Sequence, residues 1–171
     1  MNRIVIALTM SSVLALGACK KEPPEVIPPA PRDVSTPAPT PAPTAPRGPQ
    51  PGSQAHFSSA MAGSDTIYFD TDQYNIDATD MAALRRQAEY LTQYPSTRAT
   101  VEGHADERGT RDYNLALGER RANAARAYLV SLGIAENRLR TVSYGEERPV
   151  DTASTPAAWA RNRRAVTVMI D

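Results

Sequence analysis

The chain reads VEGHADERGTRDYNLALGERRA from Val101 to Ala122, and this stretch decides the fold. Its first residues alternate between apolar and polar and end in Gly-His-Ala-Asp, which predicts a strand followed by a polar turn. A helix is then expected to begin near Thr110 and to carry Tyr113, Asn114 and two consecutive arginines in its first turns. The strand, the turn and the helix start therefore form a small pocket with a carboxylate at one end and a guanidinium at the other. Such a pocket suits a ligand that carries both charges.

Hydrophobic periodicity predicts the rest of the folded domain. Strands are expected near residues 66–69, 139–144 and 165–170, in addition to the one at 99–103. We expect a helix that is capped by Asp77 or Thr79 and ended by Pro95, a long helix over about 110–132, and a short one over 157–162. The order is β-α-β-α-β-α-β. It predicts an α+β domain whose helices pack on one face of a mixed sheet.

The first 18 residues have the features of a lipoprotein signal peptide. Arg3 supplies a positive charge, and residues 4–16 form an apolar segment that is too short to span a bilayer. The sequence Leu-Gly-Ala-Cys at 16–19 resembles a bacterial lipobox, so we expect cleavage before Cys19 and acylation of this cysteine. Lys20 then favours the outer membrane. An ordinary secretion signal followed by an unrelated cysteine is the alternative.

Residues 19–63 are expected to form the lipidated cysteine and a disordered tether. Proline recurs through the tract 22–54, which lacks apolar periodicity and cannot bury enough surface to offset its ordering entropy. Proline-rich chains extend by about 3.1 Å per residue, so the tether could reach on the order of 100 Å. A docking site for a proline-recognising module is the alternative. The folded domain is expected to cover residues 64–171.

Composition and motifs exclude several classes of protein. The chain has 19 basic and 19 acidic residues, and this balance argues against a nucleic-acid partner. Its only cysteine is Cys19, so no disulfide can form within the chain. There is no Gly-x-Ser-x-Gly sequence, no cluster with metal-ligand spacing, and only two histidines. Asp70-Thr71-Asp72 starts like a calcium loop, but Asn75 and Met81 replace its required Gly and Glu. We therefore expect no enzyme, no metal and no cofactor.

Five separated segments resemble the OmpA C-terminal-like family, and within it the lipoproteins that bind peptidoglycan. These segments are residues 68–72, 103–110, 113–122, 142–149 and 162–166. The resemblance covers about residues 64–171. It implies non-covalent binding of the peptide stem of peptidoglycan through diaminopimelate, with Asp106 on the ammonium group and Arg121 on the carboxylate. The implied surrounding contacts are Asp70, Asp72, Arg108, Asn114, Leu117 and Arg163.

Arg120 and His104 lie close to these residues in the sequence, but we do not expect either of them to belong to the site. Arg120 and Arg121 point about 100° apart on a helix, so one can face the pocket and the other solvent. Because the resemblance implies that Arg121 binds the ligand, we expect Arg120 to face solvent. The resemblance implies no role for His104, which is expected to be a solvated histidine at a strand edge.

The resemblance also implies a place in the cell envelope. It predicts a lipoprotein that is anchored in the outer membrane on the periplasmic face and attaches this membrane to the cell wall. Its implied partners are peptidoglycan, TolB and other Tol proteins, in envelope integrity and cell division, with Tyr144, Gly145 and Glu146 as candidate TolB contacts. The alternatives are a wall-binding lipoprotein of the same family outside the Tol system and, much less favoured, a peptidoglycan hydrolase.

Overall fold

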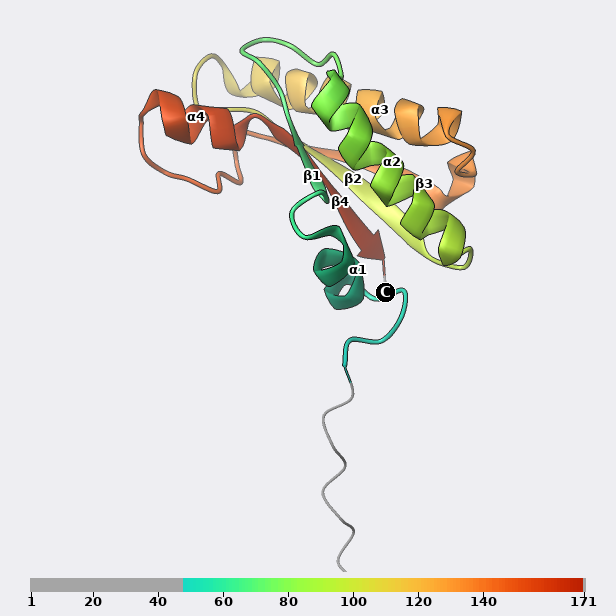
Figure 1. Cartoon of the computed structure of the whole chain (residues 1–171). Helices are drawn as coiled ribbons and strands as arrows, with labels where there is room; N and C mark the ends of the chain where they lie inside the picture. Colours follow the sequence, from blue (N-terminus) through green and yellow to red (C-terminus); the bar gives the residue numbers. More distant parts are fainter. Residues whose placement is uncertain (1–47, 171) are drawn as a thin grey trace, which may run out of the picture. The chain divides into compact units, whose positions relative to one another are not determined.

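The computed structural model describes residues 48–170 (Figure 1). The expected signal peptide, Cys19 and most of the expected tether lie outside the described residues. The elements are α1 (Gln54–Met61), β1 (Thr66–Tyr68), α2 (Ala78–Gln93), β2 (Arg98–His104), α3 (Arg111–Ser131), the 3-10 turn η1 (Glu136–Arg138), β3 (Leu139–Gly145), α4 (Pro156–Asn162) and β4 (Arg164–Ile170). Between residues 48 and 170, no helix is both long and apolar enough to cross a membrane.

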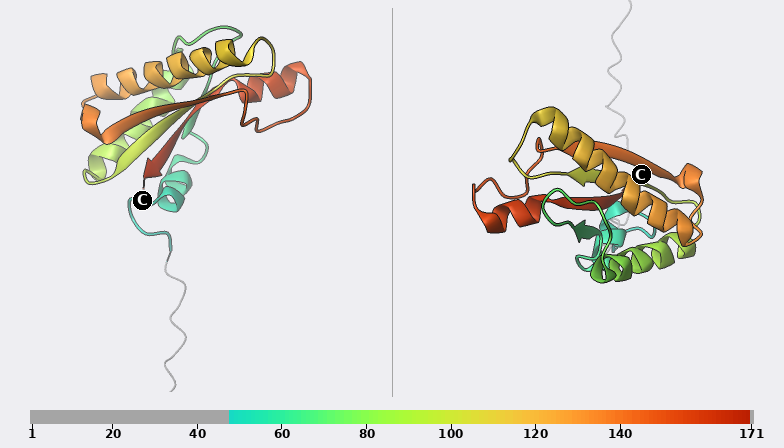
Figure 2. Two further views of the ribbon diagram at one scale, coloured as in Figure 1. Left: turned by 180° about the vertical axis from the view of Figure 1, so that it is seen from behind. Right: turned by 90° about the horizontal axis from the view of Figure 1, so that it is seen from above.

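The four strands form one mixed sheet in the order β1-β4-β2-β3. Strand β2 runs parallel to β3 and antiparallel to β4, which in turn is antiparallel to β1. Helices α2 and α3 cover one face of this sheet (Figures 1 and 2). Ala99 and Val101 of β2 and Ala165 and Met169 of β4 alternate towards that face and are buried in the core. The predicted α+β class and the order of strands and helices are confirmed.

Helix α4 has a different position from the other helices. It lies beyond the ends of the strands (Figures 1 and 2). Its Trp159 reaches the loop that follows β2, because the indole nitrogen donates to Glu107 at 2.9 Å. Helices α2 and α3 therefore form the layer that covers the sheet, and α4 contacts the loop after β2 at one end of the sheet.

The ends of the two long helices follow their sequence signals. The side chain of Asp77 caps α2 by accepting a hydrogen bond from the amide of Asp80 at 2.7 Å. Thr110 caps α3 in the same way with the amide of Tyr113. Helix α3 ends before Gly133, whose φ of 94° is the left-handed conformation that glycine adopts without strain. These caps fix the start of α3, where the pocket residues lie.

The folded part begins earlier than the expected residue 64, because α1 belongs to the core. Phe57 is 0% exposed, and its ring centroid lies 5.0 Å from that of Tyr90 on α2. The side chain of His56 forms a 2.8 Å hydrogen bond with the hydroxyl of Tyr90, and Gln54 accepts one from the amide of Met169 in β4. The Pro-rich tract thus ends at a packed helix that contacts both layers of the domain.

Strand β2 and helix α3 approach each other closely where two glycines meet. A Cβ on Gly103 would lie 1.8 Å from the carbonyl oxygen of Gly118. A Cβ on Gly118 would lie 2.4 Å from the hydroxyl of Ser143 in β3. No larger residue fits at either position with this spacing. The contact holds the first half of α3 against the end of β2.

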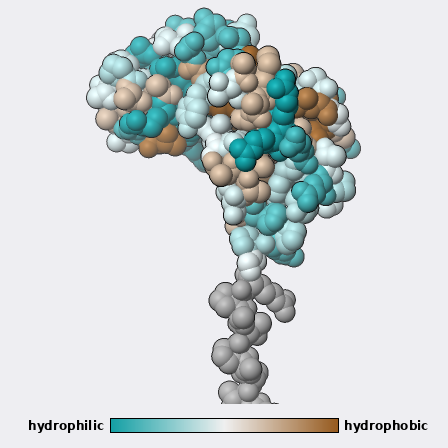
Figure 3. All heavy atoms as spheres, viewed as in Figure 1, coloured by the Kyte–Doolittle hydropathy of each residue, from teal (hydrophilic) through white to brown (hydrophobic). Residues whose placement is uncertain are grey.

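Most of the surface on the side drawn in Figure 3 is hydrophilic, and hydrophobic residues occur there in separate small areas. Scattered apolar residues of this kind are normal on a protein surface and do not by themselves mark a binding site.

Candidate functional site

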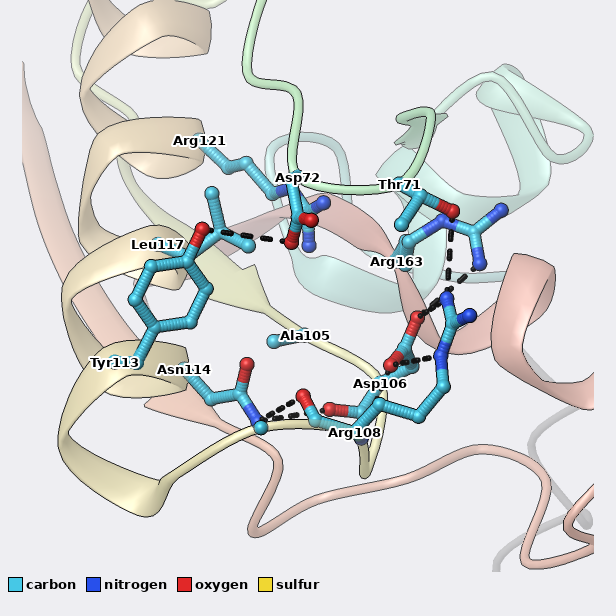
Figure 4. Close-up of a pocket in the computed structure, with 11 residues that line it drawn as sticks. Thr71, Asp72, Ala105, Asp106, Arg108, Tyr113, Asn114, Leu117, Arg121 and Arg163 are labelled. Atoms are coloured by element: carbon cyan, nitrogen blue, oxygen red, sulfur yellow. Dashed lines mark hydrogen bonds and ion pairs between the residues drawn. The ribbon is translucent and has the colours of Figure 1, made fainter.

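One pocket of about 260 Å³ gathers most of the predicted site residues at the end of β2 (Figure 4). The loop after β1, the loop after β2, helix α3 and the residue after α4 all contribute to it. The lining residues are Thr71, Asp72, Ala105, Asp106, Arg108, Gly109, Tyr113, Asn114, Leu117, Arg121 and Arg163. Seven of the eight predicted peptidoglycan-binding residues are among them, and Asp70 is the exception.

Asp106 is a buried carboxylate that two arginines hold in place. The backbone amide and Nε of Arg108 donate to Oδ1 at 3.1 and 3.0 Å, and its Nη2 donates to Oδ2 at 2.7 Å. Nη1 of Arg163 donates to Oδ2 at 3.2 Å. These four hydrogen bonds fill the acceptor capacity of a carboxylate. Burial alone would raise the pKa of Asp106, but the bonds from both arginines hold this pKa below its ordinary value.

Arg121 lies deep in the same pocket and is 0% exposed. It donates from Nε to the carbonyl oxygen of Gln73 and from Nη1 to that of His104, both at 2.8 Å, and from Nη2 to that of Asp70 at 3.1 Å. Three of its five N–H groups are thus used, and the other two donate to no group in the described part of the chain. Burial and the nearby charge of Arg163 lower the pKa of Arg121 to about 10, so it is charged at neutral pH.

Asn114 and Leu117 place the start of α3 against the pocket. The side-chain amide of Asn114 donates to the carbonyl oxygens of Asp106 and Arg108 at 3.1 and 3.0 Å and also to the carboxylate of Glu146. Leu117, one turn further along α3, is buried and lines the pocket. Asn114 therefore fixes the loop that carries Asp106, and Leu117 gives the pocket an apolar wall.

The two predicted aspartates of the β1–α2 loop lie in different places. Asp72 lines the pocket, and its carboxylate accepts a hydrogen bond from the hydroxyl of Tyr113 at 3.4 Å. Asp70 lines a neighbouring cavity of about 230 Å³ together with Asp77 and Asp80, and Arg163 borders both cavities. Asp70 contributes to the main pocket through its carbonyl oxygen, which binds Arg121.

The structure adds residues that the sequence prediction missed. Thr71 and Tyr113 line the pocket directly. The ring of Trp159 lies against the guanidinium of Arg108, 4.4 Å from ring centroid to Cζ. One signal could have identified it, because Trp159 is the only tryptophan and lies on the predicted short helix, four residues before Arg163.

The expectation of a solvated His104 is wrong, whereas Arg120 is exposed as predicted. His104 is 2% exposed, and neither ring nitrogen has a hydrogen-bond partner within the described part of the chain. Its ring packs near Tyr144, with centroids 5.5 Å apart. Burial, and then the charges of Arg164 and Arg148, lower the pKa of His104 to about 4, so it is neutral at pH 7.

The arrangement can bind a small molecule that carries both charges. The pocket presents carboxylates, guanidinium groups and a short apolar wall within one cavity. Across residues 48–170, no group of three or more His, Cys, Asp or Glu side chains could hold a metal ion. Asp106 is engaged by arginines and not by a histidine, so it does not take part in a Ser-His-Asp arrangement.

Comparison with known proteins identifies the class. The sequence model of the OmpA family matches residues 68–163. A protein of Rhizobium meliloti named "Peptidoglycan-associated lipoprotein" is 48% identical over 168 residues, which is 98% of this chain and 88% of that protein. A protein of the same name from Mesorhizobium japonicum is 54% identical over 119 residues, 70% of each chain.

Solved structures agree with this assignment. The crystal structure of the peptidoglycan-associated lipoprotein from Burkholderia pseudomallei is 42% identical, with a TM-score of 0.60, and the match covers 61% of this chain and 89% of that one. The C-terminal domain of Helicobacter pylori MotB, at 20% identity and a TM-score of 0.58, shares the fold; this match covers 62% of this chain and 84% of that one. The chain therefore belongs to the OmpA family and, within it, to the family of peptidoglycan-associated lipoproteins.

Proposed function

We propose that this protein is an outer-membrane lipoprotein that binds peptidoglycan without covalent attachment and so anchors the membrane to the cell wall. The observation that carries this proposal is the single pocket that holds Asp106 together with Arg121. The names of the relatives support one part of this proposal, the association with peptidoglycan. The second part of the proposal is that the pocket binds diaminopimelate of the peptide stem, which carries an ammonium and a carboxylate on one carbon.

The charges of the pocket are suited to both groups of such a ligand. The ammonium group is drawn to Asp106, where it replaces one N–H of Arg108, whose side chain is 42% exposed. Arg163 stays on the carboxylate because its side chain is only 13% exposed and it also binds the carbonyl oxygen of Phe69. The ligand carboxylate faces the two remaining N–H groups of Arg121. Charge-assisted hydrogen bonds of this kind are about twice as strong as neutral ones.

The proposal includes a lipid anchor on Cys19, a periplasmic position and partners of the Tol-Pal system, among them TolB. Tyr144, Gly145 and Glu146 are the proposed TolB contacts. Glu146 supports this choice because it binds Asn114, so that surface borders the pocket. In this arrangement TolB and the cell wall would compete for neighbouring residues. The same wall-binding role outside the Tol-Pal system is the alternative, and co-purification of TolB with the chain decides between them.

Binding to purified peptidoglycan sacculi tests the main proposal. The variant Asp106→Asn removes the charge at nearly constant shape and should weaken binding by 30-fold or more, as expected when about 2–5 kcal/mol of a buried charge pair is lost. Asp112→Asn, on the exposed first turn of α3, is the matched control and should bind like the unchanged chain. Circular dichroism checks that both variants are folded.

Two further measurements test which ligand is bound and whether the chain cleaves peptidoglycan. Free meso-diaminopimelate should release the chain from sacculi, whereas 1,5-diaminopentane, which has both amino groups but neither carboxylate, should do so less well. Soluble muropeptides should not appear during the incubation. Full binding by Asp106→Asn would refute the assignment of the pocket, and released muropeptides would favour the hydrolase alternative.

A further inference from the structure

Trp159 of α4 connects two charged residues of the loop after β2. Its ring lies against the guanidinium of Arg108 at 4.4 Å, and its indole nitrogen donates to the carboxylate of Glu107 at 2.9 Å. A guanidinium over an aromatic face is attracted by the charge distribution of the ring. Trp159 is half-buried, so the contact is fixed by packing on one side. The ring therefore restricts a long side chain that would otherwise have many rotamers.

The restricted side chain is the main partner of Asp106. Arg108 contributes three of the four hydrogen bonds that Asp106 accepts. Its Nη2 also reaches the hydroxyl of Thr71 across the pocket at 3.3 Å (Figure 4). Two of these bonds to the carboxylate come from the end of a side chain that is 42% exposed, so they depend on what holds that side chain.

Helix α4 thus acts on Asp106 in two ways. Arg163, at the C-terminal end of the helix, donates to Asp106 directly at 3.2 Å. Trp159 stands four residues earlier, a spacing that places two side chains on the same side of a helix. It reaches Asp106 only through Arg108. One short helix therefore supplies a direct partner and a support for the other partner.

We propose that Trp159 is a positioning residue of the pocket, which holds the guanidinium of Arg108 on the carboxylate of Asp106. This inference deepens the proposed peptidoglycan-binding function and rests on it for its biological meaning. This positioning role does not require a ligand: the ring holds the donors of Arg108 on the carboxylate of Asp106 and so keeps that carboxylate in one orientation. The bonds from Arg108 lower the pKa of Asp106, so loosening Arg108 must raise that pKa.

Other charged groups around Asp106 have to stay unchanged in a test. They are Arg108 and Glu107 from the same loop, Arg163 from the end of α4, Arg121 from α3 and Asp72 from the loop after β1. A substitution at Trp159 leaves these residues in place but removes the hydrogen bond to Glu107. Trp159→Phe removes the same bond and keeps the aromatic face, so the difference between Trp159→Leu and Trp159→Phe reports on how well Arg108 is held.

The experiment is a carboxyl-¹³C NMR titration of Asp106 in the full chain in detergent. In Trp159→Leu the titration midpoint should rise by about half a pH unit or more, the shift that corresponds to loss of a cation–π contact. Trp159→Phe keeps the aromatic face but loses the bond to Glu107, and its midpoint should stay within about 0.2 units. The matched control is Tyr94→Leu, which removes an aromatic ring that packs on Tyr90 and is not among the residues that line the pocket, and should leave the midpoint unchanged.

A merely structural role for Trp159 would leave the midpoint of Asp106 the same in all folded variants, and this outcome overturns the proposal. In the unchanged chain the side-chain protons of Arg108 should be shifted upfield by the ring, which can be measured even if Trp159→Leu does not fold. Absence of that shift also overturns the proposal.

The binding assay separates this inference from the proposed function. The acidic pH at which sacculus binding is half lost should rise with the Asp106 midpoint in Trp159→Leu. An unchanged chain that never binds sacculi would refute the proposed function, while the NMR titration would still decide the role of Trp159.

Discussion

Gly103 and Gly118 bring β2 and α3 into backbone contact, because a Cβ on Gly103 would lie 1.8 Å from the carbonyl oxygen of Gly118. This contact determines the geometry of the pocket. His104 follows Gly103 in the strand, and Arg121 follows Gly118 by about one helical turn. The close approach lets the guanidinium of Arg121 reach the carbonyl oxygen of His104 at 2.8 Å. Arg121 is thereby fixed behind the loop that carries Asp106.

A methyl group at Gly103 should disrupt this contact. We expect Gly103→Ala to lower the free energy of unfolding by about 3 kcal/mol or more, because the neighbouring atom is backbone and cannot move away alone. Urea unfolding followed by circular dichroism measures the change. Gly48→Ala is the matched control, since nothing lies within 4 Å of its Cβ, and its effect should be within about 0.5 kcal/mol. An unchanged midpoint for Gly103→Ala would contradict the packing described.

Arg121 has a structural role in addition to the proposed role in binding. Arg121→Ala removes three hydrogen bonds to carbonyl oxygens and should cost about 2–4 kcal/mol of unfolding free energy. Arg121→Lys should recover only part of this, because an ammonium group lacks the planar set of donors. Arg120→Ala, one residue away and exposed, should change stability by less than about 0.5 kcal/mol.

Because Arg121 also stabilises the fold, its variants can lose binding through unfolding. A loss of sacculus binding by Arg121→Ala is informative only at a temperature where thermal unfolding data show the variant to be folded. If Arg120→Ala proves the more damaging of the two, the helical register of α3 is different from the one described.

The sequence predicts the pocket well because its two halves are local. Asp106 and Arg121 lie on one strand–turn–helix unit, which the apolar alternation and the expected helix start near Thr110 predict. The 100° step between residues places one of two arginines at the pocket, and the family resemblance selects Arg121. Trp159 and Asp70 were harder to place because their positions depend on pairing between distant segments. The hydrogen bond from Arg163 to Asp106 joins residues that are 57 positions apart, and spacing along the chain contains no information on such a contact.

The buried state of His104 also depends on tertiary structure. The alternation of β2 places its side chain on the face of the sheet opposite α2 and α3, which predicts exposure. The side chains of Tyr144, Arg148 and Arg164 come from other segments and cover it. Helix α1 was missed for a similar reason, since two apolar residues after a Pro-rich tract are too few to form a periodic pattern.

Helix α1 should contribute strongly to stability although it follows the tether. Phe57 is 0% exposed and belongs to the core cluster, so Phe57→Ala should cost about 3–5 kcal/mol. The exposed Ser59 lies on the other side of the same helix, and Ser59→Ala should have an effect of less than about 0.5 kcal/mol. Urea unfolding of both variants checks this. Equal stability of the two variants would mean that α1 does not pack on the domain in solution.

His104 should make the domain less stable in acid. Its pKa is lowered to about 4 in the folded chain, whereas an unfolded histidine has a pKa of about 6.5. Below pH 6.5 the unfolded chain binds a proton at His104 that the folded chain does not, so stability is present above that pH and falls as the pH decreases towards 4. The difference in pKa corresponds to roughly 3 kcal/mol.

The variant His104→Leu isolates this effect, because a leucine of similar size fills the site without titrating. The unfolding free energy of the unchanged chain, minus that of the variant, should fall by roughly 3 kcal/mol between pH 7 and pH 4. The second histidine, His56, is present in both proteins and cancels in the difference. A difference that stays constant over this range would mean that His104 has the same pKa in the folded and unfolded chains, and would contradict the lowered pKa.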